Sequence, residues 1–263
     1  GFAQVGHYVV YNTTRNNTDE AIMIYCDEQD DMQSVDKEYG AVERSGARNC
    51  KELQDLGMSE DGPNIIYPLP NHPETPVMVF CDQTTQGGGW TAILRRDDSF
   101  EELTDFDRTF EEYAAGFGDV NNDFYIGNEV IHALTDTIQS ELWVTIEDID
   151  GVTGYAHYQY FHVAAREEYQ LPPYTMSIVL HEGSIGDALG YQNGMGFSAM
   201  DQDNDIDIVG ECAVRYGGGW WFRSCFLTCL TCPYESEDFH WHFEDSTYTL
   251  SKAQMMVRPS TCP

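Results

Sequence analysis

Apolar and polar residues alternate along several segments of this 263-residue chain, which is the pattern of half-buried β-strands. The clearest case is residues 141–146, where Leu142, Val144 and Ile146 fall on one face. Apolar and aromatic runs between turn residues predict further strands, at residues 21–25, 77–81, 90–94, 155–163 and 255–258. Predicted strands therefore run from near the start of the chain to near its end.

Short helices are predicted between these strands. One begins near Cys50, where Asn49 can cap the first turn and Gly57 can end the helix. Two more are expected, at residues 107–115 and 128–134. This mixture of strands and short helices is typical of an α+β domain.

Residues 183–221 break the pattern. They are rich in Gly, Asp and Asn and show little periodicity. A loop region of this length inside a folded domain is unusual unless a metal ion or a disulfide holds it. This segment is therefore the first candidate for a metal or ligand site.

The charge of the chain is strongly negative, with 45 acidic and 13 basic residues and a formal net charge of −32. Such a surface repels nucleic acids, heparin-like polymers and anionic membranes, which argues against all three as partners. It suits neutral or cationic ligands, or anions reached through a bound metal ion. High charge also favours solubility in extracellular fluid, so both interpretations stay open.

Eight cysteines and two glycosylation sequons indicate an extracellular protein. An even number of well-spread cysteines is typical of disulfides formed in an oxidising compartment. The sequons make Asn12 and Asn16 predicted N-glycosylation sites. No run of about 18 apolar residues is present, and the start, Gly-Phe-Ala, is not a signal peptide, so a secreted, mature form is expected.

The chain carries no motif of a known catalytic centre. It lacks a Gly-x-Ser-x-Gly elbow, a His-Glu-x-x-His helix and a phosphate-binding loop. His132, in the apolar segment from Ile131 to Leu134, is expected to be a core residue with satisfied hydrogen bonds. We therefore predict that the chain is not an enzyme.

A series of motifs occurs in a fixed order in the rest of the chain. They are VFCDQTTQGGGWT at 79–91, DFYIGNE at 123–129, IHALT at 131–135, NGM at 193–195, DND at 203–205, GWW at 219–221 and MVRP at 256–259. Their order and spacing resemble the fibrinogen C-terminal-like, or fibrinogen-related, domain family, which includes the ficolins and tachylectins. Residues 48–263 are predicted to form this domain, and residues 1–47 an acidic, glycosylated N-terminal extension.

The resemblance implies an α+β fold with three parts: a small N-terminal disulfide subdomain, a central twisted antiparallel sheet, and a loop-rich C-terminal subdomain that carries the calcium and ligand sites. It also implies two disulfides, Cys50–Cys81 and Cys212–Cys225. The other four cysteines allow three pairings. Our choice among them is Cys229–Cys232 with Cys26–Cys262, the second of which would tie the extension to the C-terminus.

The acidic run at residues 201–207 is the candidate calcium site. Calcium prefers several hard oxygen ligands. An EF-hand is excluded because Ile206 stands where Gly is needed and Cys212 where Glu is needed. The resemblance implies a Ca²⁺ ion held by the side chains of Asp203 and Asp205 and by backbone carbonyls near Asp207 and Val209.

Zinc is a second, weaker possibility. Cys225, Cys229 and Cys232 lie near His240 and His242, and these residue types form tetrahedral zinc sites. An oxidising compartment and the family pairing of Cys225 argue against it.

Lectins of the family hold an acetyl group between aromatic residues and a His that follows the second Cys of the C-terminal disulfide. Here that position is Phe226, and the resemblance implies Tyr216 as a remaining aromatic wall. The rim at residues 233–247 is shortened, and Trp241 or Tyr248 could refill it. Since Phe226 cannot donate a hydrogen bond as His can, simple acetyl-sugar binding is expected to be weak or absent.

The expected function is that of a secreted, calcium-binding recognition protein of the lectin type with an altered acetyl-sugar pocket. The alternative is a structural or protein-interaction subunit of an extracellular assembly. The expected partner is a glycan or an extracellular protein, and a homo- or hetero-oligomer is expected. A fibrinogen-type peptide knob is not expected, because Arg215 and Tyr216 replace acidic and amide residues of that site.

Overall fold

The computed structural model describes residues 7–15, 18–26, 46–234 and 236–260. The chain divides into two compact units. One contains residues 1–45 and 261–263, and the other contains residues 46–260.

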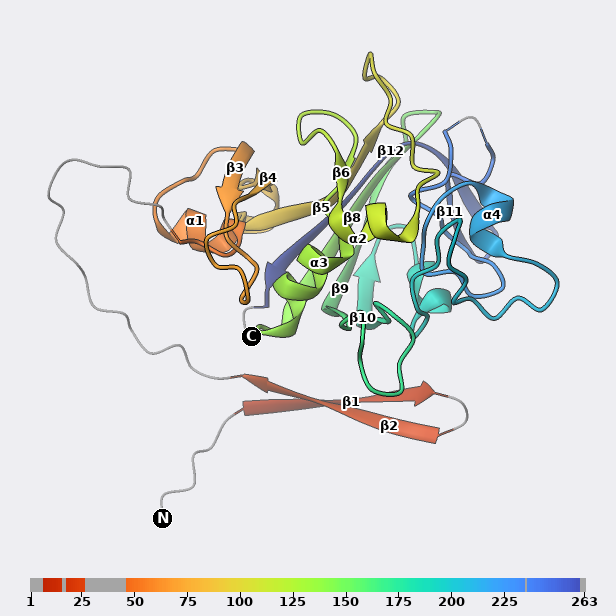
Figure 1. Cartoon of the computed structure of the whole chain (residues 1–263), viewed down its shortest axis with the longest axis horizontal. Helices are drawn as coiled ribbons and strands as arrows, with labels where there is room; N and C mark the ends of the chain where they lie inside the picture. The colour runs from red at the N-terminus through yellow and green to blue at the C-terminus, as the bar shows by residue number, and fades with distance from the viewer. Residues whose placement is uncertain (1–6, 16–17, 27–45, 235, 261–263) are drawn as a thin grey trace, which may run out of the picture. The chain divides into compact units, whose positions relative to one another are not determined.

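The first unit contains a β-hairpin. Strands β1 (His7–Arg15) and β2 (Thr18–Cys26) pair antiparallel, with His7 opposite Cys26 (Figure 1). β2 contains the strand expected at residues 21–25, whereas β1 was not predicted. Asn12 lies on β1. Asn16 and Cys262 lie outside the described residues, so glycosylation and the Cys26–Cys262 disulfide remain predictions.

The second unit is built on one ten-stranded antiparallel sheet. Its strands are β3 (Gly62–Ile66), β4 (Val77–Asp82), β5 (Trp90–Asp97), β6 (Phe117–Gly118), β7 (Phe124–Tyr125), β8 (Ser140–Asp148), β9 (Thr153–Val163), β10 (Met176–Gly183), β11 (His240–Phe243) and β12 (Ser246–Pro259). All the expected strands of this unit are present. The strands β3, β6, β7, β10 and β11 were not predicted, and β12 is longer than the expected strand at residues 255–258.

The order of strands along the main path of the sheet is β10-β9-β8-β12-β5-β4-β3. β12, the last strand of the chain, lies between β8 and β5 at the centre of the sheet (Figure 1). β11 pairs with β12, and the short strands β6 and β7 attach beside β5. The sheet can therefore be completed only when the C-terminal segment of this unit is in place.

The helices are short and lie around the sheet (Figure 1). They are α1 (Cys50–Asp55), α2 (Phe110–Ala115), α3 (Asn128–Asp136) and α4 (Cys212–Tyr216), with 3₁₀ turns η1 (Thr85–Gly87) and η2 (Leu189–Gln192). Within the described ranges, no helix is long and apolar enough to cross a membrane. The predicted α+β class is confirmed.

Local sequence explains where the helices begin. The Asn49 side chain accepts a hydrogen bond from the backbone N–H of Glu52 at 2.9 Å, so it caps α1 as expected. α2 starts three residues later than predicted because Thr109 and Glu112 form a reciprocal capping box there.

Aromatic side chains connect the helices to the C-terminal loops. Tyr113 on α2 is fully buried, with ring centroids 5.0–5.1 Å from those of three others, Phe117, Tyr125 and Phe197. Its hydroxyl donates to the carbonyl of Phe106 and accepts from the backbone N–H of Gly219. A buried tyrosine needs such partners, and here they fix the loop before Trp220 against α2.

A buried ion pair holds a second part of these loops. Nε of Arg96 lies 3.7 Å from the Asp123 carboxylate, and both side chains are almost completely buried. Arg96 also donates to the backbone carbonyls of Leu230 and Cys232, and Tyr234 donates to Asp123. The strand β5 and the loop at residues 230–234 are thereby joined through charged groups.

Three disulfides occur in the second unit: Cys50–Cys81, Cys212–Cys225 and Cys229–Cys232. These are three of the four pairs expected from the sequence. The first joins α1 to β4, and the other two brace the loops after residue 200. Since Cys225, Cys229 and Cys232 are all oxidised, they offer no thiolate to a zinc ion.

Candidate functional site

The acidic loop that begins at Asp201 is organised by its own backbone. Asp201 accepts a hydrogen bond of 2.7 Å from the backbone N–H of Phe110, the first residue of α2. Asp203 accepts one from the N–H of Asp205 at 3.0 Å, and Asp205 accepts one from the N–H of Asp207 at 2.8 Å. Bonds to the backbone two residues ahead form Asx turns, so successive aspartates fold the loop.

Asp203 and Asp205 form the part of the loop best suited to a cation. Neither carboxylate forms an ion pair with any residue that the structure describes. The second oxygen of Asp205 accepts from the N–H of Cys212 at 2.9 Å. Burial raises the pKa of Asp205, and the neighbouring charge of Asp203 adds to this effect. A calcium ion would offset the repulsion between the two carboxylates, so they fit such an ion.

The other two predicted calcium residues lie further along the loop. The carboxylate of Asp207 forms a 3.3 Å ion pair with Arg215 and accepts a hydrogen bond from the N–H of Val209. With its side chain engaged by a guanidinium, Asp207 would contribute its backbone carbonyl, as the resemblance implies. These four residues remain the predicted calcium ligands.

Apolar side chains surround this acidic loop and point into solvent. Ile208 is 99% exposed and Val209 is 82% exposed, and three more are at least two-fifths exposed: Met200, Ile206 and Val214. We call these five residues the apolar rim. Single exposed apolar residues are ordinary, but five within fifteen positions form a candidate contact surface.

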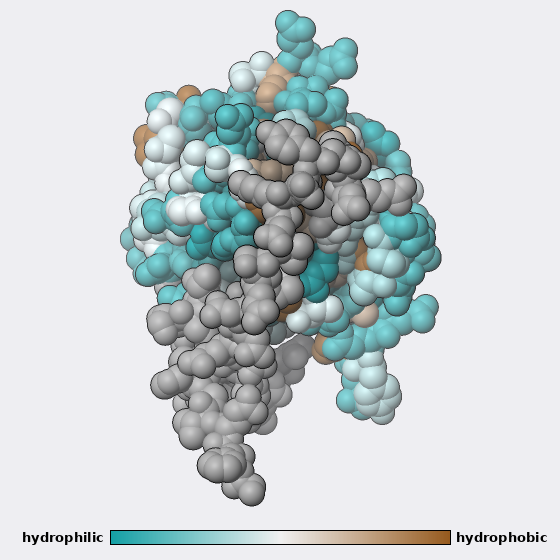
Figure 2. Space-filling view, turned by 90° about the vertical axis from the view of Figure 1, so that its left-hand side faces the viewer, coloured by the Kyte–Doolittle hydropathy of each residue, from teal (hydrophilic) through white to brown (hydrophobic). Residues whose placement is uncertain are grey.

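The face of the domain on the side of α1 has a different character. Where Figure 2 shows this face in colour, most residues are hydrophilic, with a few hydrophobic ones among them. Exposed apolar residues occur here as well, since Leu56, Met58, Ile65 and Met78 are 45–63% exposed, but no acidic loop of the kind at residues 201–207 accompanies them in the described part of this side.

Two of the predicted ligand-site residues lie together. The ring of Tyr216 meets that of Phe226 edge to face, with centroids 4.8 Å apart. Phe226 also packs against His240, with centroids 5.3 Å apart, and against the fully buried Phe222. Phe226 therefore fills space between aromatic neighbours and offers no polar atom to a ligand.

Of the other two ligand-site predictions, Trp241 needs correction, whereas Tyr248 stays a prediction. Trp241 is 0% exposed, and its indole N–H donates to the backbone carbonyl of Ile185 at 3.0 Å. It is a core residue and cannot line a pocket. Tyr248 lies opposite Trp241 in the β11–β12 pairing and packs partly buried against the core. Trp241 is the buried position of β11, a strand that the sequence analysis did not predict.

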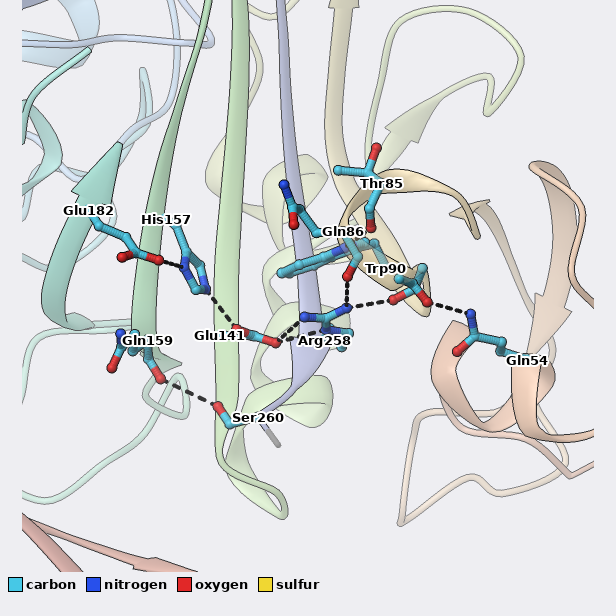
Figure 3. A network of polar contacts seen from close by, with 12 residues as sticks. Gln54, Thr85, Gln86, Trp90, Glu141, His157, Gln159, Glu182, Arg258 and Ser260 are labelled. Carbon is cyan, nitrogen blue, oxygen red and sulfur yellow. Dashed lines mark hydrogen bonds and ion pairs between the residues drawn. The ribbon is translucent and has the colours of Figure 1, made fainter. Parts of the chain in front are cut away.

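The open face of the sheet carries a polar network that sequence reasoning missed (Figure 3). The ring nitrogens of His157 on β9 lie 2.7 Å from a carboxylate oxygen of Glu141 and 3.0 Å from one of Glu182. Arg258 on β12 donates to the other oxygen of Glu141 at 2.7 Å, and its guanidinium lies 4.1 Å from the centroid of the Trp90 ring. The network joins β10, β9, β8 and β12 in register.

A cavity of about 550 Å³ adjoins this network on the same side of the sheet. Trp143 and Tyr155 line it, stacked almost parallel with centroids 4.6 Å apart. Polar and charged side chains complete its walls, among them Thr145, Lys252 and Gln254. Sequence alternation assigns these residues to outward positions, but only the strand order brings them together.

Comparisons with known proteins agree with this architecture. A family model described as the C-terminal globular domain of fibrinogen beta and gamma chains matches residues 46–260. The chain is 36% identical over 221 residues to Ryncolin-4 of Cerberus rynchops, covering 81% of this chain and 61% of that protein.

Two solved structures are similar. The fibrinogen-like globe domain of human ANGPTL2 has a TM-score of 0.72 at 30% sequence identity, covering 82% of this chain and 100% of that one. A lamprey fibrin D-dimer complexed with the peptide ligand Gly-His-Arg-Pro-amide has a TM-score of 0.71 at 26% identity, covering 82% of this chain and 74% of that one.

The chain therefore belongs to the fibrinogen C-terminal domain family, as its motifs indicated. Members of this family are non-enzymatic recognition or structural proteins, so the chain is not an enzyme. The chain spans 61% of Ryncolin-4 and smaller shares of the other curated relatives that it matches first.

Proposed function

We propose that this chain is an extracellular recognition module that binds a protein ligand through the apolar rim, and that calcium orders the loop carrying this rim. The observation behind the proposal is the exposure of Ile208 and Val209 beside the carboxylates of Asp203 and Asp205. Burying such side chains against a partner is worth about 25 cal/mol per Å².

The chemistry of the partner follows from the charge. With a net charge of −32, the chain favours a ligand surface that combines basic and apolar groups. The lamprey fibrin structure, which has the same fold, is complexed with a peptide that contains an arginine and a histidine. That complex supports a peptide or protein as the class of ligand. The same peptide is not the expected ligand, because Arg215 and Tyr216 replace acidic and amide residues of the fibrinogen peptide site.

An acetylated sugar is the second candidate, supported by the surviving aromatic wall at Tyr216. We rank it lower because Phe226 occupies the place of the hydrogen-bonding His and packs against Tyr216 and His240. A sugar amide placed there would lose one polar partner, at a cost of about 1–3 kcal/mol.

Secretion is part of the proposal, because the three disulfides need an oxidising compartment to form and persist. If the chain forms an oligomer, several apolar rims could bind one partner at the same time, and weak individual contacts would then give a higher overall affinity.

The experiment is selection of peptides from a displayed random library on the whole chain in the presence of calcium. Selected peptides should be basic and apolar. Their affinity should fall by about tenfold or more for Ile208→Asp, which places a charge in the rim. Ile149→Asp is the matched control, since Ile149 is equally apolar and 67% exposed but lies in the β8–β9 turn. Peptides that bind both variants equally, or a glycan array that gives the only calcium-dependent signal, would refute the proposal.

A further inference from the structure

His132, Asp136 and His162 lie together at the edge of the helical layer. One ligand atom from each lies within 4.8 Å of the other two. His132 and Asp136 are four residues apart on α3 and therefore share a face of the helix. His162 comes from β9, against which α3 packs (Figure 1). His132, which was expected to be a core residue with satisfied hydrogen bonds, is half-buried, has a hydrogen-bond partner in the backbone carbonyl of Val163, and lies near these two residues.

The ring of His132 is held in an orientation suited to a metal ligand. Its Nδ1 lies 2.9 Å from the backbone carbonyl of Val163, so the proton of the neutral ring sits on Nδ1 and the lone pair on Nε2. The N–H of Val163 in turn donates to the hydroxyl of Thr135 at 3.1 Å. Two side chains of α3 therefore contact both backbone polar groups of Val163 on β9. A carbonyl partner on the second ring nitrogen is the usual support of a metal-bound histidine.

His162 and Asp136 complete the cluster. Nε2 of His162 lies 3.7 Å from a carboxylate oxygen of Asp136. The His162 side chain is 22% exposed and that of Asp136 is 53% exposed, so the site is open to solvent on one side.

The carboxylate of Asp136 lies at an electrostatically unfavourable position. It is the last residue of α3, where the helix dipole places partial negative charge. A carboxylate is unfavourable at a helix C-terminus, and the last turn, residues 133–136, contains no Lys or Arg to compensate. A divalent cation bound there would be stabilised by the dipole and by the carboxylate together.

We propose that His132, Asp136 and His162 form a binding site for a divalent transition-metal ion such as Zn²⁺, distinct from the predicted calcium loop. Two imidazoles and one carboxylate, with water in the fourth position, are a common ligand set for zinc, whereas calcium takes oxygen ligands only. Zinc ligands at about 2.0–2.2 Å from the ion lie about 3.4 Å apart, so the cluster must contract slightly. Asp136 can supply that movement because its side chain is exposed.

The bound ion would join the C-terminal end of α3 to β9. Because it binds the folded chain and finds no preformed site in the unfolded one, it should raise the free energy of unfolding. The acidic surface raises the local concentration of cations and favours loading. This inference does not depend on the proposed ligand of the apolar rim.

The test is calorimetric titration of metal-free whole chain with ZnCl₂, in calcium so that the acidic loop is saturated. The wild type should bind one zinc ion at this site. His162→Ala and Asp136→Ala should each lower the affinity by more than about tenfold, the lower end of what even outer-shell changes cause. His72→Ala, which removes an exposed histidine elsewhere, should leave it unchanged.

Two further measurements distinguish zinc binding at this site from a general effect of the substitutions on folding. Zinc should raise the melting temperature of the wild type and leave that of His162→Ala unchanged, with each chain compared with its own metal-free melt. Cu²⁺ bound in place of zinc should show coupling to two nitrogen nuclei in its electron paramagnetic resonance spectrum, and to one in His162→Ala. Unchanged zinc affinity in both His162→Ala and Asp136→Ala would overturn the proposal.

Discussion

Nε2 of His157 lies 2.7 Å from Oε2 of Glu141, and Nδ1 of the same ring lies 3.0 Å from Oε1 of Glu182 (Figure 3). Both neighbours are acceptors, so His157 can donate to each only as an imidazolium. Burial alone would lower the pKa of His157, but the hydrogen bonds and charges of the two carboxylates outweigh it and raise the pKa above the usual 6.5. The sheet therefore carries a histidine that keeps its proton to unusually high pH.

This arrangement predicts the pH dependence of stability. Since the folded-state pKa of His157 is raised, its contribution is fully present below the unfolded value of 6.5 and is lost as pH rises through the folded pKa. His157→Gln should therefore lower the free energy of unfolding most at about pH 6 and progressively less towards about pH 9. Urea unfolding at a series of pH values measures this difference.

His72→Gln is the control for the His157 prediction, because His72 is exposed. Its stability should follow the wild type at every pH. The carboxyl of Glu141 behaves in the opposite sense: His157 and Arg258 together lower its pKa against the effect of burial, so its contribution is lost as pH falls below 4.5. A constant difference between wild type and His157→Gln across the whole range would contradict the assignment.

The His157 network also marks a limit of sequence reasoning. The aromatic run at residues 155–163 correctly predicted β9, in which His157 lies on the outward side. Its partners Glu141, Glu182 and Arg258 lie on three other strands, and β10, which carries Glu182, was not predicted. Local periodicity gives a strand and its faces, but not its neighbours or its register. Contacts across strands could therefore not be predicted.

The candidate site was likewise predicted only in part from the sequence. The motifs placed the acidic loop, and the family pairing placed Cys212 beside Cys225. Trp241 was expected to refill the shortened rim at residues 233–247. In the structure it is buried in the core, because β11 pairs with β12 and the indole N–H donates to the backbone carbonyl of Ile185. Residues in irregular loops are positioned by distant partners, and sequence spacing does not contain that information.

The buried pair of Arg96 and Asp123 predicts a large loss of stability for a single truncation. Arg96→Ala would leave the fully buried Asp123 carboxylate without a cation and would remove the hydrogen bonds to the carbonyls of Leu230 and Cys232. Breaking a buried ion pair from one side costs about 3–5 kcal/mol. Chemical denaturation should show this loss in the free energy of unfolding.

The neighbouring Arg95 provides the comparison for Arg96. It is half-buried and lies over the rings of Phe80 and Phe100, at 4.7 and 5.3 Å from their centroids. Arg95→Ala should cost only about 1 kcal/mol, the size of a partly exposed cation–π contact. Equal losses for the two variants would mean that the buried charge pair is not the source of the effect.

Calcium is predicted to stabilise the chain through Asp203 and Asp205. At a calcium concentration of 100 times the dissociation constant, the gain should be about 2.7 kcal/mol by mass action. Asp203→Ala or Asp205→Ala should abolish the rise in melting temperature on addition of calcium. Asp245→Ala, which removes an exposed carboxylate near β11, should keep the full rise. A calcium-dependent rise that persists in both loop variants would place the ion elsewhere.

Binding of N-acetylglucosamine is predicted to be weak or absent, with a dissociation constant above about 1 mM. The reason lies in the contact between Tyr216 and Phe226, whose centroids are 4.8 Å apart, because Phe226 fills the position with carbon alone. Phe226→His restores a donor beside the Tyr216 wall and should tighten binding, since a lost polar partner costs about 1–3 kcal/mol. Calorimetric titration with the sugar, in calcium and in chelator, compares the two chains.

Phe226→Leu controls for the change in bulk and should bind no better than the wild type. Saturable, calcium-dependent binding by the wild type that disappears in Tyr216→Ala would instead mean that the pocket works without the histidine, and the ordinary lectin function would then replace the protein-ligand proposal.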